Sequence, residues 1–234
     1  MIRGDNFWCC DWNLFFCCTG LWCSEGGQSA TGKLIDHILE THPAYSQLSP
    51  DNKYEQLSQI ISQLAEQKNV PEYQLTADLH VYPDFHGNRS PLANPAMKGM
   101  ICGLTLNSGL DELAVLYLAI LQSLVYGTRH IVEKMEEHGH SIAAVYVCGG
   151  LTKNKLFIQM NADVLNRQVV ISHEPESVLL GSALLGICAA SSAEGTKLGD
   201  VIQSVKSDGD VYTPNTNSIS YHDKKYAIYT KMCE

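Results

Sequence analysis

Residues 146–157 constrain the fold of this chain more than any other stretch, because they place a glycine pair between a strand and a helix. The apolar residues 143–147 predict a buried strand, after which the chain reaches Gly149 and Gly150. A helical hydrophobic pattern follows, and residues 168–171 predict a second short strand. The order strand, glycine pair, helix, strand is typical of a nucleotide site in a parallel sheet.

The glycine pair also suits a bound ligand. Glycine lets the backbone come close to a ligand, and the start of a helix offers unpaired N–H groups to a phosphate or a ring acceptor. An ordinary strand-to-helix turn has the same pattern, so the glycines alone leave both interpretations open. Motifs elsewhere in the chain favour nucleotide binding.

The remaining sequence predicts helices that alternate with short strands. Helices are expected at 29–39, between Asp51 and Asn69, between Asp111 and Gly139, at 178–190 and at 221–226, with a further strand at 75–81. Asp51 is the expected N-cap of the second helix. This alternation predicts an α/β domain, and 234 residues suffice for a proper core.

Three segments of the chain, in the same order, resemble the FGGY carbohydrate kinases. The glycine pair and Asn154 resemble the Gly-Gly-x-x-x-Asn signature on which that family's adenine site is built. Residues 26–34 (Gly-Gly-Gln-Ser-Ala-Thr-Gly-Lys-Leu) resemble the segment that opens the first helix of the family's second lobe. Residues 83–91 and 98–104 resemble its Pro-x-x-x-Gly-x-Arg-x-Pro loop and its Arg/Lys-Gly strand. The sequence Asp-Phe-His-Gly-Asn-Arg-Ser-Pro is most similar to the branch that phosphorylates ribulose-like pentuloses.

The resemblance covers nearly the whole chain, but only the C-terminal half of the family's two-lobed architecture. It implies an actin-like, ribonuclease-H-like ATPase fold, with this chain as the lobe that holds the nucleotide. It also implies an ATP-dependent kinase that phosphorylates an alcohol group of a small sugar, such as D-ribulose or another pentulose. Mg²⁺ is then held mainly through the ATP phosphates and waters, without a protein metal ligand. A cytoplasmic location is expected because the cysteines after residue 23 sit singly in apolar contexts, as in a reduced cytosolic protein.

The resemblance assigns nucleotide contacts to particular residues. Gly149 and Gly150 would let the backbone lie beside the adenine or ribose, and Asn154 would hydrogen-bond the base. A role as the N-cap of the following helix is the alternative for Asn154. Gly27 aligns with a glycine that approaches the ATP phosphates, and Gln28 follows it. A tight turn into the first helix is the alternative there.

Gly181 and a cluster in the loop region are further candidates for ligand or metal binding, but a structural role is favoured for both. Gly181 packs under the nucleotide in related proteins, although helix–helix packing is favoured here. Acidic, basic and imidazole side chains gather in the loop region at Asp78, His80, Asp84, His86 and Arg89. Such a density suits a divalent ion, but we expect Asp84 and Arg89 to fix the loop geometry and His80 to be half-buried on a strand.

No catalytic residue is predicted within this chain. The family uses an Asp as general base, in a Gly-x-x-Asp context upstream of the segment at 26–34. Before Gly26 the chain has only Asp5 and Asp11, in contexts that do not resemble it. Phosphoryl transfer depends on positioning and charge stabilisation, so the chain alone is expected to be inactive and to act on a sugar only with a complete first lobe. A non-catalytic nucleotide-binding or interaction module of the same fold is the alternative, and the exact sugar and the oligomeric state are left open.

The composition of the chain disfavours two classes of binding partner. The net charge of −9 argues against nucleic acids and anionic membranes, because both select positive surfaces. The hydrophobic content of 45% and the charged content of 18% are typical of a globular protein.

The start of the chain differs from the rest. Residues 1–23 contain all three tryptophans and five of the nine cysteines. The uncharged run at 12–24 is shorter than the roughly 20 residues that a membrane span needs, and Asp5 and Asp11 interrupt the apolar region that a secretory signal requires. The cysteine pairs lack the C-x₂-C spacing of zinc sites. We interpret residues 1–19 as a leader outside the fold, and residues 20–234 as the domain.

Overall fold

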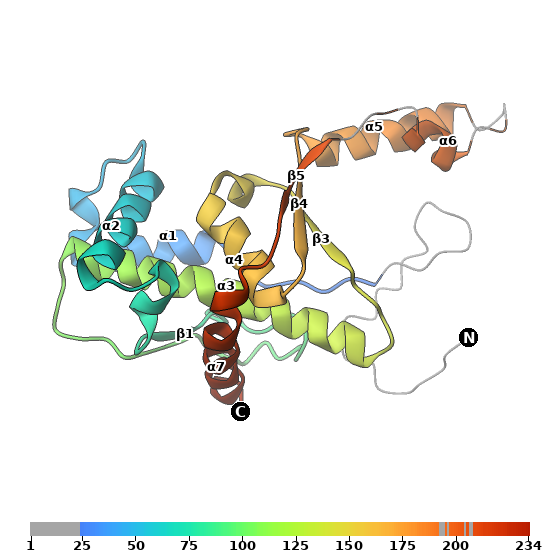
Figure 1. Ribbon diagram of the computed structural model, residues 1–234. Coiled ribbons are helices and arrows are strands. Elements are labelled where there is room, and N and C mark those ends of the chain that lie inside the picture. Colours follow the sequence, from blue (N-terminus) through green and yellow to red (C-terminus); the bar gives the residue numbers. More distant parts are fainter. Residues whose placement is uncertain (1–23, 192–194, 196, 204, 206–207) are drawn as a thin grey trace.

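The computed structural model describes residues 24–191, 195, 197–203, 205 and 208–234, so the predicted leader at 1–19 lies outside the described part. A long helix, α3 (Leu110–Glu137), runs through the middle of the fold. Four helices contact it (Figure 1): α1 (Gly32–Thr41), α2 (Lys53–Lys68), α4 (Lys155–Leu165) and α7 (Thr216–Met232). The position of α3 confirms the longest predicted helix, which ends before Gly139 with φ of 92°.

Helix α3 is the core element of the domain. Among the described helices, it is the one long and apolar enough to cross a membrane, but 78% of its apolar window is buried by the rest of the fold. Its leucines, isoleucines and valines form the hydrophobic core together with side chains from α1, α2 and α4. A helix that is apolar on nearly every face is expected at such a central position.

Helices α1 and α2 are joined by a short 3₁₀ helix, η1 (Pro43–Gln47). The N-cap of α2 is Asn52, so the predicted cap Asp51 lies one residue too early. The helix ends at Asn69, whose φ of 52° is left-handed and stops the helical hydrogen bonding.

The strand predicted at 75–81 is wrong in its first half. A 3₁₀ helix, η2 (Glu72–Thr76), occupies this part, and only β1 (His80–Tyr82) is extended. Strand β1 pairs antiparallel with β2 (Met100–Cys102), with Val81 opposite Ile101. The 3₁₀ helix η2 is held by a tertiary contact, because the Thr76 hydroxyl donates to Gln122 Oε1 of α3 at 2.6 Å. Such contacts override a local alternation of apolar residues.

The second sheet carries the predicted strand–helix–strand unit. Strand β3 (Ala144–Val147) is parallel to β4 (Gln168–Ser172), and α4 connects them. Strand β5 (Gly209–Tyr212) adds antiparallel to β4, which gives the order β3-β4-β5. Alternate side chains such as Val145, Val169 and Ile171 join the core that α4 covers. The opposite face exposes Tyr146 and Val211.

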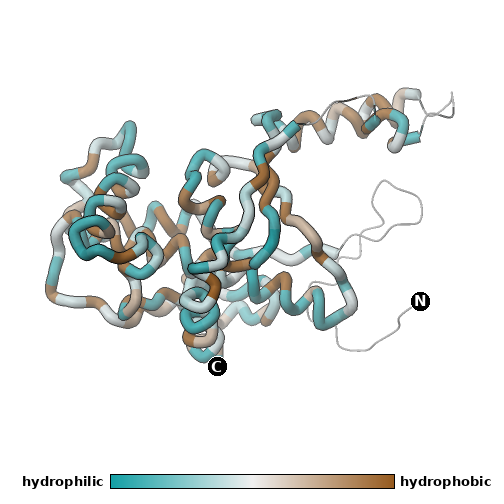
Figure 2. Tube along the Cα trace, in the orientation of Figure 1, coloured by the Kyte–Doolittle hydropathy of each residue, from teal (hydrophilic) through white to brown (hydrophobic). Residues whose placement is uncertain are grey.

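Helix α5 (Ser177–Ala190) extends away from the helices around α3 and contacts α6 (Leu198–Gln203) (Figure 1). None of the residues of α5 is buried, although its sequence is apolar on every side. Figure 2 shows hydrophobic residues along α5 as well as in the interior of the domain. Val178 and Leu179 are 70% and 66% exposed.

The final helix is longer than predicted. Helix α7 spans Thr216–Met232, whereas the sequence predicted a helix only at 221–226. It begins at Asn215, whose side chain accepts a hydrogen bond from the backbone N–H of Asn217. The polar residues of its first turn carry little hydrophobic periodicity, which is why its start was missed.

Candidate nucleotide-binding site

The glycine pair lies where β3 ends and α4 begins. Gly149 has φ of 90° and ψ of −172°, a conformation that residues with a side chain rarely adopt. A short 3₁₀ helix, η3 (Gly150–Lys153), follows, and the Thr152 hydroxyl donates to the Gly149 carbonyl oxygen at 2.7 Å. A Cβ on Gly150 would meet none of the described atoms within 4 Å. Packing therefore does not require glycine at position 150, and the backbone there is accessible to a ligand.

Asn154 closes this loop and starts α4. Its Oδ1 atom accepts the backbone N–H of Phe157 at 3.1 Å, so Asn154 is the N-cap of α4. Its Nδ2 atom donates to the hydroxyl of Tyr117 in α3 at 2.7 Å. An amide has two N–H donors and two acceptor lone pairs. Asn154 thus satisfies the predicted N-cap role and keeps one donor and one acceptor for a ligand.

The segment at 26–28 is fixed against α3. A Cβ on Gly26 would lie 2.7 Å from Ile131 Cγ2, so glycine is required by close packing. Gln28 Nε2 donates to the Leu124 carbonyl oxygen at 2.7 Å and to Thr128 Oγ1 at 3.1 Å. These contacts support the structural alternative for Gln28, which anchors the entry to α1 on α3. Its Oε1 atom is buried without a hydrogen-bond partner among the described residues.

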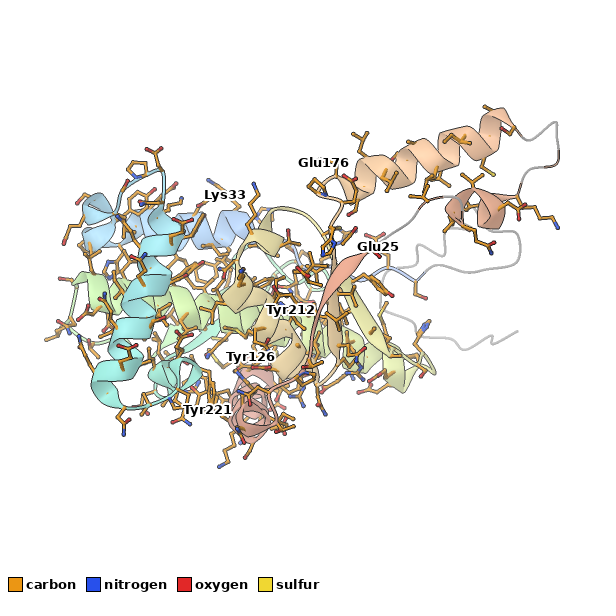
Figure 3. All side chains as sticks on the ribbon, turned by 45° about the horizontal axis from the view of Figure 1, so that its top comes forward. Glu25, Lys33, Tyr126, Glu176, Tyr212 and Tyr221 are labelled. Atoms are coloured by element: carbon orange, nitrogen blue, oxygen red, sulfur yellow. The ribbon has the colours of Figure 1, made fainter. Side chains whose placement is uncertain are left out.

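Gly27 is less constrained than its neighbours. A Cβ there would meet only the Arg89 side chain, at 3.8 Å. Arg89 forms an ion pair of 2.6 Å with Glu25, which is labelled in Figure 3. The ion pair places a guanidinium beside Gly27, where a group that binds phosphate is expected. The predicted phosphate contact of Gly27 stays a prediction.

Comparison with known proteins identifies the domain. The sequence pattern of the FGGY family of carbohydrate kinases, C-terminal domain, matches residues 12–190. This chain belongs to the FGGY family. The match begins within residues 1–19, which the structure does not describe, so their interpretation as a leader stays a prediction.

Relatives within the FGGY family are considerably longer than this chain. An FGGY carbohydrate kinase domain-containing protein of Xenopus laevis is 48% identical over 219 residues, which cover 91% of this chain and 39% of that protein. D-ribulokinase YDR109C of Saccharomyces cerevisiae is 37% identical over 196 residues, or 80% of this chain and 27% of that protein. The chain thus spans less than half the length of these curated relatives.

Solved structures confirm the predicted actin-like, ribonuclease-H-like ATPase fold. Xylulose kinase from Rhodospirillum rubrum superposes with a TM-score of 0.69 over 91% of this chain and 39% of that chain, at 23% sequence identity. A ligand-bound xylulose kinase from Lactobacillus acidophilus gives a TM-score of 0.65 at 20% identity. At these identities the similarity concerns the fold alone.

Gly181 in this FGGY domain lies on α5, away from close neighbours. A Cβ on Gly181 would have no described atom within 4 Å. The space around Gly181 therefore does not require a glycine among the described residues, and its packing role stays a prediction. Its proposed place beside the nucleotide stays a prediction.

In the loop region at 78–89, Asp84 has the structural contacts that we expect. Asp84 is buried and its Oδ2 atom accepts a hydrogen bond from Asn88 Nδ2 at 2.6 Å, which fixes the loop. His80 is half-buried on β1, whereas Asp78 and His86 are exposed. Within the described residues, no group of three or more His, Cys, Asp or Glu side chains gathers as a metal site.

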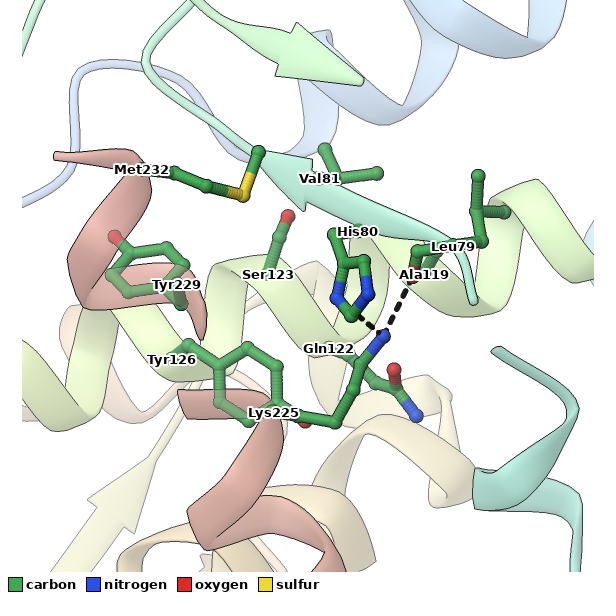
Figure 4. Close-up of a pocket in the computed structure, with 10 residues that line it drawn as sticks. All are labelled: Leu79, His80, Val81, Ala119, Gln122, Ser123, Tyr126, Lys225, Tyr229 and Met232. Atoms are coloured by element: carbon green, nitrogen blue, oxygen red, sulfur yellow. Dashed lines mark hydrogen bonds between the residues drawn. The ribbon is translucent and has the colours of Figure 1, made fainter. Parts of the chain in front are cut away.

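Lys225 of α7, which no sequence pattern marks as buried, lies against the residues at the start of β1. Its ammonium group lies 2.6 Å from the Leu79 carbonyl oxygen and 3.0 Å from His80 Nδ1 (Figure 4). It also lies 2.6 Å from the Thr76 carbonyl oxygen. Burial lowers the pKa of Lys225 to about 8. The adjoining cavity of about 10 Å³ has room for one water at most, and no residue of the Gly149–Asn154 loop lines it. This cavity is too small for a nucleotide.

Proposed function

We propose that this chain is the ATP-binding lobe of a carbohydrate kinase, which transfers the γ-phosphate of ATP to an alcohol group of a pentulose such as D-ribulose. The observation that carries the proposal is the loop from Gly149 to Asn154. It combines a glycine-only backbone conformation, an open backbone at Gly150 and a helix-capping amide with unused donor and acceptor capacity.

We assign the base and ribose of the nucleotide to the Gly149–Asn154 loop, and its phosphates to the segment at Gly27. The Asn154 amide meets the base, and the backbone at Gly149 and Gly150 lies beside the base or the ribose. Gly27, in the segment before α1, lies beside the Arg89 side chain, and we place these two groups near the phosphates. Mg²⁺ enters with ATP, since it keeps several waters and is commonly held through substrate phosphates.

The choice of a pentulose rests on two supports. The sequence of the loop at 84–91 resembles that of the ribulose-phosphorylating branch, and the relatives include a protein named D-ribulokinase. We place the sugar site and its general base outside this chain, which covers 39% of the Xenopus laevis relative. The chain by itself therefore binds ATP without phosphorylating a sugar.

A non-catalytic nucleotide-binding module is the second candidate. The two candidates differ in what happens when the remainder of an FGGY kinase is supplied, because only a kinase lobe then gives sugar-dependent turnover.

The test is an assay of ADP production with ATP·Mg²⁺ and a panel of pentuloses. The purified chain is assayed alone, and then fused behind the upstream part of a close FGGY relative. We expect background ADP production from the chain alone and pentulose-dependent production from the fusion. A fusion that binds ATP but ignores every pentulose supports the non-catalytic module. Robust pentulose-dependent turnover by the chain alone contradicts the assignment of the base to another lobe.

We further propose a cytoplasmic location without nucleic-acid or membrane partners. Among the described cysteines, Cys102, Cys148 and Cys233 form no disulfide, as is usual in a reducing compartment. The net charge of −9 disfavours anionic partners.

A further inference from the structure

We infer that Tyr117 is a positioning residue, which orients the Asn154 amide so that it presents a fixed donor and a fixed acceptor to an adenine base. This inference rests on the proposed nucleotide site. Tyr117 lies on α3 with 1% of its surface exposed, and its hydroxyl is 2.7 Å from Asn154 Nδ2. Among the described residues, Asn154 is the hydrogen-bond partner of this hydroxyl.

The two contacts of Asn154 determine its amide orientation together. The Phe157 N–H requires an acceptor, so it selects Oδ1 rather than Nδ2 at the helix start. A single hydrogen bond to Oδ1 still lets the amide plane turn about its terminal torsion, which is broad for Asn. The second contact, from Nδ2 to Tyr117, holds the plane and fixes where the unused N–H and lone pair point.

The unused groups match one type of base edge. Adenine presents an N–H donor next to a ring nitrogen acceptor, so a single amide binds both of them. Guanine presents two acceptors on the corresponding edge, and one of these would face the amide oxygen. An amide held in one orientation therefore favours adenine nucleotides, and a freely turning amide favours them less.

Tyr117 is itself held from the side of α1 and α2. Its ring stacks on Tyr54 of α2, with ring centroids 5.9 Å apart and planes inclined by 28°. The Tyr54 hydroxyl donates to Asp36 of α1 at 2.7 Å, and Lys53 pairs with the same carboxylate at 2.8 Å. Burial raises the pKa of Tyr117, so its hydroxyl stays protonated at neutral pH. The site of nucleotide binding on α4 is thus tied to the N-terminal helices.

The test compares Tyr117→Phe with Tyr126→Phe in the full chain. Tyr126 is a matched control, because it is a buried tyrosine of the same helix whose hydroxyl contacts a side chain of another helix, His222 at 2.9 Å. Two quantities are measured for each variant: the ¹⁵N relaxation of the Asn154 side-chain amide by NMR, and the dissociation constants of ATP·Mg²⁺ and GTP·Mg²⁺ by calorimetry.

We expect Tyr117→Phe to mobilise the Asn154 amide and to weaken ATP binding about fivefold to tenfold, with little effect on GTP. Tyr126→Phe should leave both quantities unchanged. An Asn154 amide that stays ordered in Tyr117→Phe overturns the inference, as does a mobile amide with unchanged ATP affinity. If the unaltered chain binds no ATP, the proposed function fails, and the relaxation of the amide alone decides whether Tyr117 orients it.

Discussion

The hydroxyl of Tyr126 and the Nδ1 atom of His222 lie 2.9 Å apart in the buried contact between α3 and α7. Burial lowers the pKa of His222 to about 4, and the positive charges of Lys225 and Arg129 act in the same direction. The imidazole is therefore neutral at pH 7, and a change of its charge acts on the contact that holds α7 to the core helix.

We expect the free energy of unfolding to fall between pH 7 and pH 5. The folded-state pKa of His222, about 4, is lower than its ordinary value of 6.5, so the unfolded chain binds the proton first. The neutral form of His222 therefore contributes its full stability above pH 6.5, and this contribution is lost as the pH falls towards 4. At pH 5 the loss in the free energy of unfolding is about 2 kcal/mol. Urea unfolding at both pH values measures the difference.

The control for this pH dependence is His222→Asn, which keeps a polar partner for Tyr126 but does not titrate. Burial also lowers the pKa of His42, His80 and His130, so a smaller fall remains in the variant. A variant whose stability falls as steeply as that of the unaltered chain shows that His222 is not the responsible group.

The two glycines of the loop should respond differently to alanine. Gly149→Ala is expected to lower the free energy of unfolding by about 1–3 kcal/mol, because its backbone conformation suits only glycine. Gly150→Ala should cost little stability, since a Cβ there meets no described atom within 4 Å. Gly150→Val should also fold, but block ATP binding by filling the ligand's space. Equal destabilisation by the two alanine variants contradicts this account of the loop.

Asn154 combines a structural role and a proposed binding role that two substitutions separate. Asn154→Ala removes the N-cap and should lower the free energy of unfolding by about 1 kcal/mol, whereas Asn154→Ser retains a capping oxygen. Both lose the amide, and ATP binding should weaken by about 1–2 kcal/mol in both. Urea unfolding and calorimetry measure the two effects. If serine restores the ATP affinity along with the stability, the amide acts only as a cap.

The exposed apolar surface of α5 should cause self-association. Leu179 is 66% exposed on a helix in which no residue is buried, and contiguous exposed apolar surface favours association. Leu179→Glu is expected to lower the average mass in sedimentation experiments. Leu104→Glu serves as the control, since Leu104 is 59% exposed but lies outside α5. A similar reduction by both variants removes α5 as the specific cause.

The strand–glycine–helix unit was predictable because its determinants are local in sequence. The apolar run before Gly149, the helical pattern after Asn154 and the strand at 168–171 each carry a clear period. The structure places them as β3, α4 and β4. The N-cap alternative for Asn154 was also local, because the cap contacts the residue three positions later.

The hydrogen bonds that hold Asn154 and Gln28 in place join residues that are far apart in the sequence. Tyr117 and Asn154 are 37 residues apart, and Gln28 reaches Thr128 across 100 residues. Neither pairing leaves a periodic trace in the sequence, so Gln28 was assigned to the nucleotide and Tyr117 was not singled out. The burial of Lys225 was missed for the same reason, since its partners lie more than 140 residues away.

Calorimetric titration of the unaltered chain with ATP·Mg²⁺, compared with Asn154→Ser, tests whether the Gly149–Asn154 loop binds a nucleotide. We expect saturable binding of ATP at one site, and a loss of about five- to thirtyfold in affinity in the variant. ATP binding that is equally strong in the variant, or no ATP binding by the unaltered chain, contradicts the claim that the Gly149–Asn154 loop is a nucleotide site.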